Sequence, residues 1–169
     1  MMKVLVPVDG SSNALHAVHH VLSEYQRNPA IDIHLLNVQP PFSRNVTRWS
    51  DRKTINEAHL DASEQALQPI RQMLDKVCVP YSVHLAVGGK ASSIAEFARQ
   101  LRCDHIVIGT ARKNSLMRTV EGSVTNEVLE LTTVPVIAVA GDLPSTWERY
   151  RIQLGAGGGL AWLVVAALE

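Results

Sequence analysis

Five short apolar runs divide the chain, at residues 3–8, 31–38, 79–87, 104–109 and 134–140. Most of these runs are continuously apolar rather than strictly alternating, which is typical of strands whose two faces are both covered. We therefore expect five strands of a parallel sheet. Pro7 has no backbone N–H to donate, so we place it near the end of the first strand.

Helical spacing of apolar residues fills the intervals between the runs. One stripe follows Ser11 and Ser12 and comprises Ala14, Leu15, Val18, Val21, Leu22 and Tyr25. A longer stripe extends from Ile55 to Val77 and contains Pro69, which should kink or split that helix.

Two further helices precede the last two runs. We expect a capping box of Ser93 and Glu96 ahead of Ile94, and a short helix capped by Ser123 that carries Val124, Val128 and Leu131. The segment from Phe42 to Arg52 has no periodicity and is expected to be a loop.

The alternation of strands and helices predicts an α/β fold, in which one five-stranded parallel sheet has helices on both faces in a Rossmann-like, doubly wound arrangement. Ligands of such sheets bind beyond the carboxyl ends of the strands, where the strand order reverses. Asp9, Val38 and Gly109 occupy those ends in the sequence. They are therefore the first candidates for a ligand site.

The stretch from His105 to Val124 combines a strand, a basic loop and a helix start. Arg112, Lys113 and Arg118 lie in the loop, and Gly122 and Ser123 precede the helix. An anion at Ser123 would meet free backbone N–H groups and the positive end of the helix dipole, so we interpret this stretch as a nucleotide site. The alternative is two turn glycines, an ordinary helix cap and a solvated basic loop.

Charge and cysteine content restrict the other possibilities. Lys and Arg number 16, as do Asp and Glu, so no net field attracts nucleic acid or an anionic membrane. Cys78 and Cys103 form no C-x-x-C pair, which favours reduced, buried thiols and a cytoplasmic protein. The first ten residues resemble a strand rather than a signal peptide.

Other chemistry finds little support in the sequence. His16 and His20 have a spacing that can chelate a metal, but no acidic or cysteine partner is evident, and we expect no metal site. Gly88, Gly89 and Lys90 are better explained by a tight turn than by a phosphate loop, since no Ser or Thr follows the lysine. No hydrolase motif is present, so we expect no catalytic residues and, at most, slow ATP hydrolysis.

Four motifs together resemble the universal stress protein family of UspA-like proteins. They are the N-terminal segment from Val6 to Ser11, Gly109-Thr110, Gly122-Ser123 thirteen residues after Gly109, and Val134-Pro135-Val136. The resemblance covers about residues 2–140. It implies a five-stranded parallel fold, dimers formed through the last strand, and ATP binding through a G-x2-G-x9-G-[ST] pattern.

The resemblance also assigns residues to the nucleotide. Asp9 would contact the ribose and the α-phosphate region, and the adenine would lie among Val8, Val38 and Ile108. The expected nucleotide-binding residues are Pro7, Val8, Asp9, Val38, Ile108, Gly109, Arg112, Gly122, Ser123 and Val124. Arg112 occupies the position of the second motif glycine, where it either obstructs the phosphates or grips them.

The expected function is that of a stress-response protein which binds ATP, ADP or AMP, with or without Mg²⁺, and acts as a regulatory homodimer through Val136, Ile137, Ala138 and Val139. Its protein partner is unknown, and we expect neither nucleic acid nor membrane as a partner. One alternative is a dimer that binds no nucleotide and works through protein contacts. A second alternative is a slow ATPase.

The C-terminal part departs from this pattern. We divide the chain into a nucleotide-binding domain at 1–140, a linker at 141–153 and an apolar, glycine-rich tail at 154–169. The apolar stretch is shorter than the roughly 20 residues of a spanning helix. It either packs on protein, which we favour, or rests on a membrane surface, or derives in part from an expression-tag junction at Leu168 and Glu169.

Overall fold

The computed structural model describes residues 1–42, 51–110 and 124–141. The basic loop with Arg112, the pair Gly122 and Ser123, and the tail at 154–169 lie outside the described residues.

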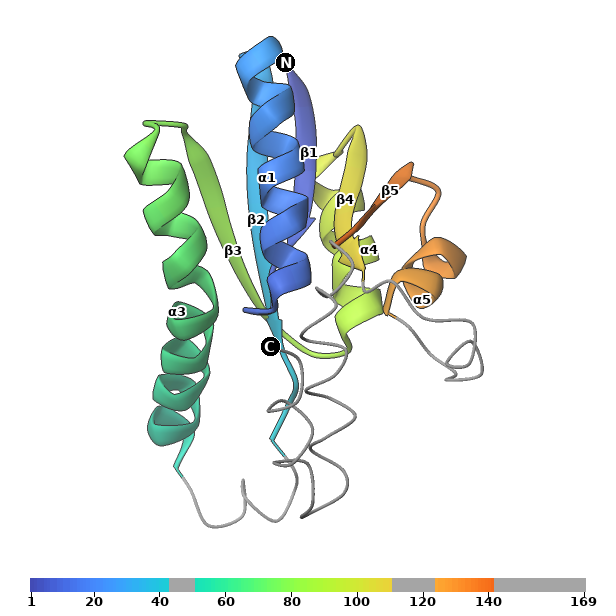
Figure 1. The fold of residues 1–169 in the computed structure, drawn as a ribbon. Helices are drawn as coiled ribbons and strands as arrows, with labels where there is room; N and C mark the ends of the chain where they lie inside the picture. Colours follow the sequence, from blue (N-terminus) through green and yellow to red (C-terminus); the bar gives the residue numbers. More distant parts are fainter. Residues whose placement is uncertain (43–50, 111–123, 142–169) are drawn as a thin grey trace, which may run out of the picture.

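Five strands and four helices alternate along the described chain (Figure 1). The strands are β1 (Met2–Pro7), β2 (Ile31–Gln39), β3 (Tyr81–Val87), β4 (His105–Thr110) and β5 (Val136–Ala140), and the helices are α1 (Ser12–Arg27), α3 (Arg52–Lys76), α4 (Lys90–Leu101) and α5 (Val124–Leu131). All strand pairs are parallel, in the order β3-β2-β1-β4-β5. The predicted fold class is confirmed, and the order reverses between β1 and β4.

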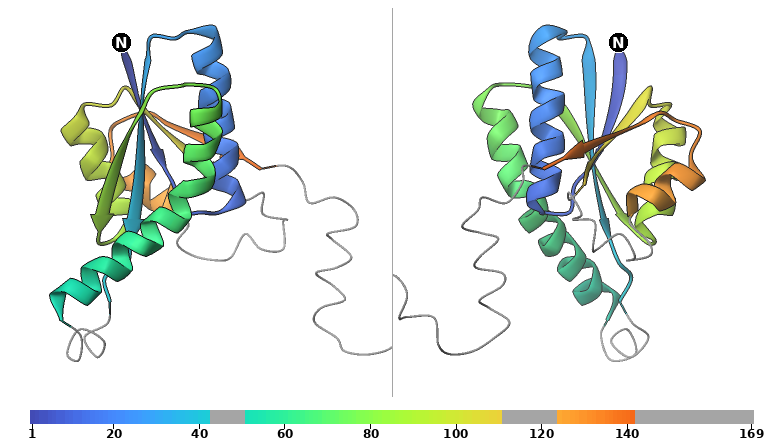
Figure 2. Two further views of the ribbon diagram at one scale, coloured as in Figure 1. Left: turned by 90° about the vertical axis from the view of Figure 1, so that its left-hand side faces the viewer. Right: turned by 45° about the vertical axis from the view of Figure 1, so that its right-hand side comes forward.

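Helices cover both faces of the sheet, so the described chain forms three layers (Figure 2). Helices α1 and α3 cover one face, and α4 and α5 cover the other. Along β1, Val4 and Val6 point toward α1 and α3, whereas Leu5 points toward α4. Because successive side chains serve opposite layers, a strand in this position must be apolar at every residue. This is the physical origin of the continuous apolar runs.

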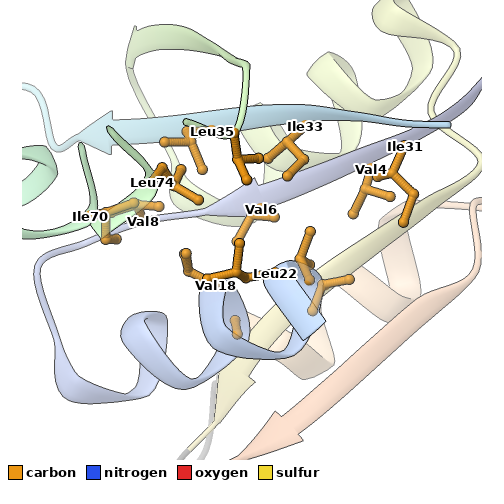
Figure 3. Close-up of a cluster of buried hydrophobic side chains, with 14 of the residues drawn as sticks. Val4, Val6, Val8, Val18, Leu22, Ile31, Ile33, Leu35, Ile70 and Leu74 are labelled. Atoms are coloured by element: carbon orange, nitrogen blue, oxygen red, sulfur yellow. The ribbon is translucent and has the colours of Figure 1, made fainter. Parts of the chain in front are cut away.

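The larger core lies between the sheet and helices α1 and α3 (Figure 3). Val18 and Leu22 of α1 and Ile70 and Leu74 of α3 pack against the valines of β1 and the branched side chains of β2. Leu35 of β2 is fully buried. Burial of a side chain of this size contributes about 1.5–3 kcal/mol, so this layer fixes the position of β1 and β2.

Helix α3 is continuous through Pro69 rather than split there. Figure 2 shows that α3 changes direction about half-way along its length. A bend is the expected result of the lost backbone hydrogen bond and the crowding of the preceding turn. No helix among the described residues is both long enough and apolar enough to span a bilayer.

Two local expectations are wrong. Helix α4 begins at Lys90 with Gly89 as its N-cap, so Ser93 and Glu96 form no capping box; Glu96 instead accepts from Arg99 and Gln100. Cys78 is exposed, although Cys103 is buried as expected. Cys78 has a φ of 52°, a conformation in which it turns the chain out of α3.

The sheet and α1 approach each other closely at Gly109 of β4. A Cβ atom on this residue would overlap the carbonyl group of Asn13 and lie 2.8 Å from the backbone nitrogen of Ala14. These atoms belong to the backbone at the start of α1. Backbone atoms cannot move aside as a flexible side chain can. Gly109 is therefore required for packing, independently of any ligand.

We predict that Gly109→Ala destabilises the fold by about 3 kcal/mol, because α1 must move away from β4. Urea unfolding measures this change. Gly88→Ala is the matched control, since its Cβ would meet only the Ser93 hydroxyl at 3.3 Å and should cost much less. Equal losses in the two variants would contradict the packing argument.

Candidate nucleotide site at the carboxyl edge

A cavity of about 280 Å³ opens at the carboxyl edge of the sheet, beside the point where the strand order reverses. It is lined by the ends of β1, β2 and β4 and by the first residues of α1, α4 and α5. The lining residues are Pro7, Val8, Asp9, Ser11, Asn13, Ala14, Leu36, Val38, Lys90, Ile94, Ile108, Gly109, Thr110, Val124 and Thr125.

One part of the cavity is apolar and firmly held. Val8, Val38 and Ile108 are each at least 93% buried; Val8 directly follows β1, and the other two lie in the neighbouring strands β2 and β4. Leu36 and Ile94 complete this part from β2 and α4. A flat apolar group enters such a slot without the loss of any hydrogen bond.

The end of β1 is held in place by a buried amide. Asn37 is 1% exposed, and its Nδ2 donates to the carbonyl oxygen of Val8 at 2.7 Å. Gln39 in turn donates to Oδ1 of Asn37 at 2.8 Å. The backbone N–H of Val8 donates to the carbonyl oxygen of Leu36 at 2.8 Å. These bonds extend the pairing of β1 with β2 by one residue beyond Pro7, to Val8. They fix the position of the backbone from which Asp9 projects.

Asp9 forms part of the turn into α1 and also faces the cavity. The backbone N–H of Ser11 donates to its Oδ1 at 3.1 Å, and the Ser11 hydroxyl caps the helix by accepting from Ala14 at 3.2 Å. Partial burial raises the pKa of Asp9, but the bonds from Ser11 and the nearby Lys90 ammonium outweigh it and hold the pKa below its ordinary value. The carboxylate is thus ionised at neutral pH, and its bond within the turn is compatible with the contact to a ligand that the sequence predicts.

Gly10 makes this turn possible. Its φ is +79°, and an added Cβ would also lie 3.3 Å from the backbone of Ala66 in α3. Only glycine adopts this conformation readily while α3 lies so close.

The structure brings most of the predicted site residues together. Pro7, Val8, Asp9, Val38, Ile108, Gly109 and Val124 all line the same cavity. Arg112, Gly122 and Ser123 lie outside the described residues, so their positions stay predictions. Helix α5 begins directly after Ser123, and its first two residues, Val124 and Thr125, face the cavity.

Lys90 is the one charged residue of the described lining that the sequence did not predict for the site; uncharged lining residues such as Ser11 and Thr110 are also absent from the predicted set. Lys90 was interpreted as part of a tight turn, yet it lines the cavity that also contains Asp9. The position of Lys90 at the first residue of α4, where a cation opposes the helix dipole, is evident only from the structure, because the sequence pattern places the start of this helix at Ser93.

Neither metal nor cysteine chemistry is evident in the described parts of the chain. No group of three His, Cys, Asp or Glu side chains gathers there in a way that could hold a metal ion. Burial raises the pKa of Cys103 to about 11, so its thiol is protonated at neutral pH.

Sequence comparison identifies the family. The sequence model described as the universal stress protein family matches residues 1–140. The chain belongs to this family. A curated relative, universal stress protein MJ0531 of Methanocaldococcus jannaschii, is 28% identical over 139 residues, which is 81% of each chain.

Solved structures share the universal stress protein fold. Hypothetical protein MJ0577 superposes with a TM-score of 0.62 at 23% identity, over 84% of this chain and 97% of that one. A family protein of Arabidopsis thaliana solved with AMP gives 0.59 at 18% identity, over 86% and 98%. A universal stress protein of Archaeoglobus fulgidus in complex with dAMP gives 0.58 at 22% identity, over 82% and 98%.

The low pKa of Asp9 predicts a pH dependence of stability. Because the folded-state pKa lies below the unfolded one, the carboxylate stabilises the fold above about pH 4, and this contribution disappears as the pH falls through the folded-state pKa. The free energy of unfolding of the wild type should therefore exceed that of Asp9→Asn by a margin that is constant at neutral pH and shrinks below about pH 4. Urea unfolding of both proteins across this range measures the margin, and a margin that grows in acid would contradict the assignment.

Proposed function

We propose that this universal stress protein is a regulatory protein that binds an adenine nucleotide in the cavity at the carboxyl edge. The observation that carries the proposal is the juxtaposition of a rigid apolar slot and an ionised carboxylate in one cavity at the switch point. Family members solved with AMP and dAMP support the choice of adenine.

The two parts of the cavity suit the two parts of a nucleoside. Adenine is flat and apolar on its faces, and the slot among Val8, Val38 and Ile108 accepts such a group. Ribose hydroxyls are donors, and the Asp9 carboxylate is an acceptor that forms strong, charge-assisted bonds with them. The phosphates then extend toward the start of α5 and, in this proposal, toward Arg112, Gly122 and Ser123.

The proposed role is regulation rather than catalysis. Among the described lining residues, Asp9 alone has a side chain that is a plausible general base. Any ATP hydrolysis is therefore expected to be slow. A ligand that contacts the starts of α1, α4 and α5 alters the surface at this edge of the sheet. We propose that a protein partner in the cytoplasm binds this surface differently when the ligand is present.

The nucleotide proposal is tested by ligand content and thermal shift. The protein is denatured, and the supernatant is analysed by anion-exchange chromatography beside thermal melts with added Mg-ATP. At ATP concentrations of 100 times Kd the melting temperature should rise by about 5–10 °C. Asp9→Ala should weaken binding at least about tenfold, whereas Asp61→Ala, an exposed site on α3, should leave it unchanged.

No bound nucleotide and no shift in the wild type would contradict the proposal. Arg112→Gly added to the same assay decides between the two roles of that arginine. A tighter complex means that Arg112 obstructs the phosphates, and a weaker complex means that it grips them.

We also propose that the protein is a homodimer through β5. This strand is at one edge of the sheet and pairs with β4 along one side. The expected interface is Val136 to Val139, of which Ala138 is exposed in the single chain. An edge of this kind is a template for pairing with a second strand.

Ala138→Lys should convert the dimer to a monomer, because a charged side chain at the strand edge opposes pairing. Sedimentation equilibrium measures the mass. Thr133→Lys, exposed but outside β5, is the matched control and should remain dimeric. A dimer that survives Ala138→Lys would place the interface elsewhere.

A further inference from the structure

Lys90 is the sole cation among the described residues that line the cavity. It faces a space that also contains the Asp9 carboxylate. The basic residues of the 111–123 loop are not needed to establish this arrangement.

The turn before α4 fixes the position of Lys90 at the carboxyl edge. The backbone N–H of Gly88 donates to the carbonyl oxygen of Gln39, the last residue of β2, at 2.9 Å. Gly89 is the N-cap, and its carbonyl oxygen accepts from Ser93 N and from the Ser92 hydroxyl, each at 3.0 Å. The backbone of Lys90 is therefore anchored beside the end of β2, next to the apolar slot.

The lysine interacts with the Asp9 carboxylate across the cavity, where its positive charge helps to lower the pKa of Asp9. Within the described residues its ammonium forms no hydrogen bond and no ion pair of contact distance. A cation at the first residue of a helix also opposes the helix dipole and destabilises α4 slightly. The attraction to Asp9 acts at longer range than a contact ion pair, so the ammonium of Lys90 has no contact partner among the described residues and is free to meet a ligand.

We propose that Lys90 contacts the phosphate of the bound ligand and makes the cavity selective for nucleotides over nucleosides. This inference rests on the proposed nucleotide function and adds a residue and a selectivity to it.

The charge balance of the cavity supports this role. An ionised Asp9 attracts ribose hydroxyls but repels a phosphate group in the same small space. A lysine on the same cavity offsets that repulsion and supplies up to three N–H donors to phosphate oxygens. With Asp9 alone the cavity would favour adenosine, whereas with Lys90 it accepts a phosphorylated ligand.

The test compares adenosine, AMP and ATP by isothermal titration calorimetry on the wild type and on Lys90→Met, which retains length and the apolar stem. Lys90→Met should lower the affinity for AMP and ATP by about tenfold or more. Its affinity for adenosine should change less than twofold. Lys90→Arg should restore most of the loss. Lys76→Met, an exposed lysine at the last residue of α3, is the matched control and should bind all three ligands like the wild type.

The outcomes separate this inference from the function on which it rests. Lys90→Met removes a cation that opposes the helix dipole but also removes the attraction to Asp9, and these two effects oppose each other. The melting temperature without ligand should therefore change little, and an unchanged value excludes misfolding as the cause of a loss of binding. Unchanged AMP binding, or equal losses for adenosine and AMP, overturns the phosphate role and leaves the nucleotide proposal standing. A wild type that binds none of the three ligands overturns both.

Discussion

The contact between β4 and the start of α1 at Gly109 is the constraint on which the site depends. Backbone meets backbone there, with no room for a side chain. At this contact Asn13 and Ala14 lie against Gly109, and all three line the cavity. A glycine that family motifs associate with phosphate thus has a packing function that precedes any ligand.

The cavity combines rigid and charged components that come from different parts of the fold. The apolar slot belongs to the strand ends, which are fixed by cores on both faces of the sheet. Asp9 and Lys90 belong to the turns that follow β1 and β3. Substitutions in the turns can therefore change ligand preference without disturbing the cores, which is why such sites accept many ligands on one scaffold.

The sequence predicted the sheet and most of the cavity because both follow from short-range patterns. Continuous apolar runs require strands between two helical layers, and the residues that follow β1, β2 and β4 must then meet at one edge. Lys90 was missed because the predicted site was built from the ends of β1, β2 and β4, which carry the motif residues. Lys90 instead follows β3, which is an edge strand of the sheet. Only the turn between Gly88 and Gly89, bonded to Gln39, shows that this residue returns to the cavity.

The two wrong local expectations have a common cause. Ser93 and Glu96 match a capping pattern, yet Gly89 is the N-cap because the bonded turn at Gly88 starts α4 four residues earlier than the pattern suggests. Cys78 lies beside apolar residues in sequence, yet its left-handed backbone directs the chain out of α3 toward Val79, which is buried instead. In both cases the turn geometry between elements decided the outcome, and residue type alone does not encode it. The turn at Gly88 and Gly89 also positions Lys90. In this fold, therefore, the residues whose placement is hard to predict from the sequence and the charged residues of the site both lie in or beside turns.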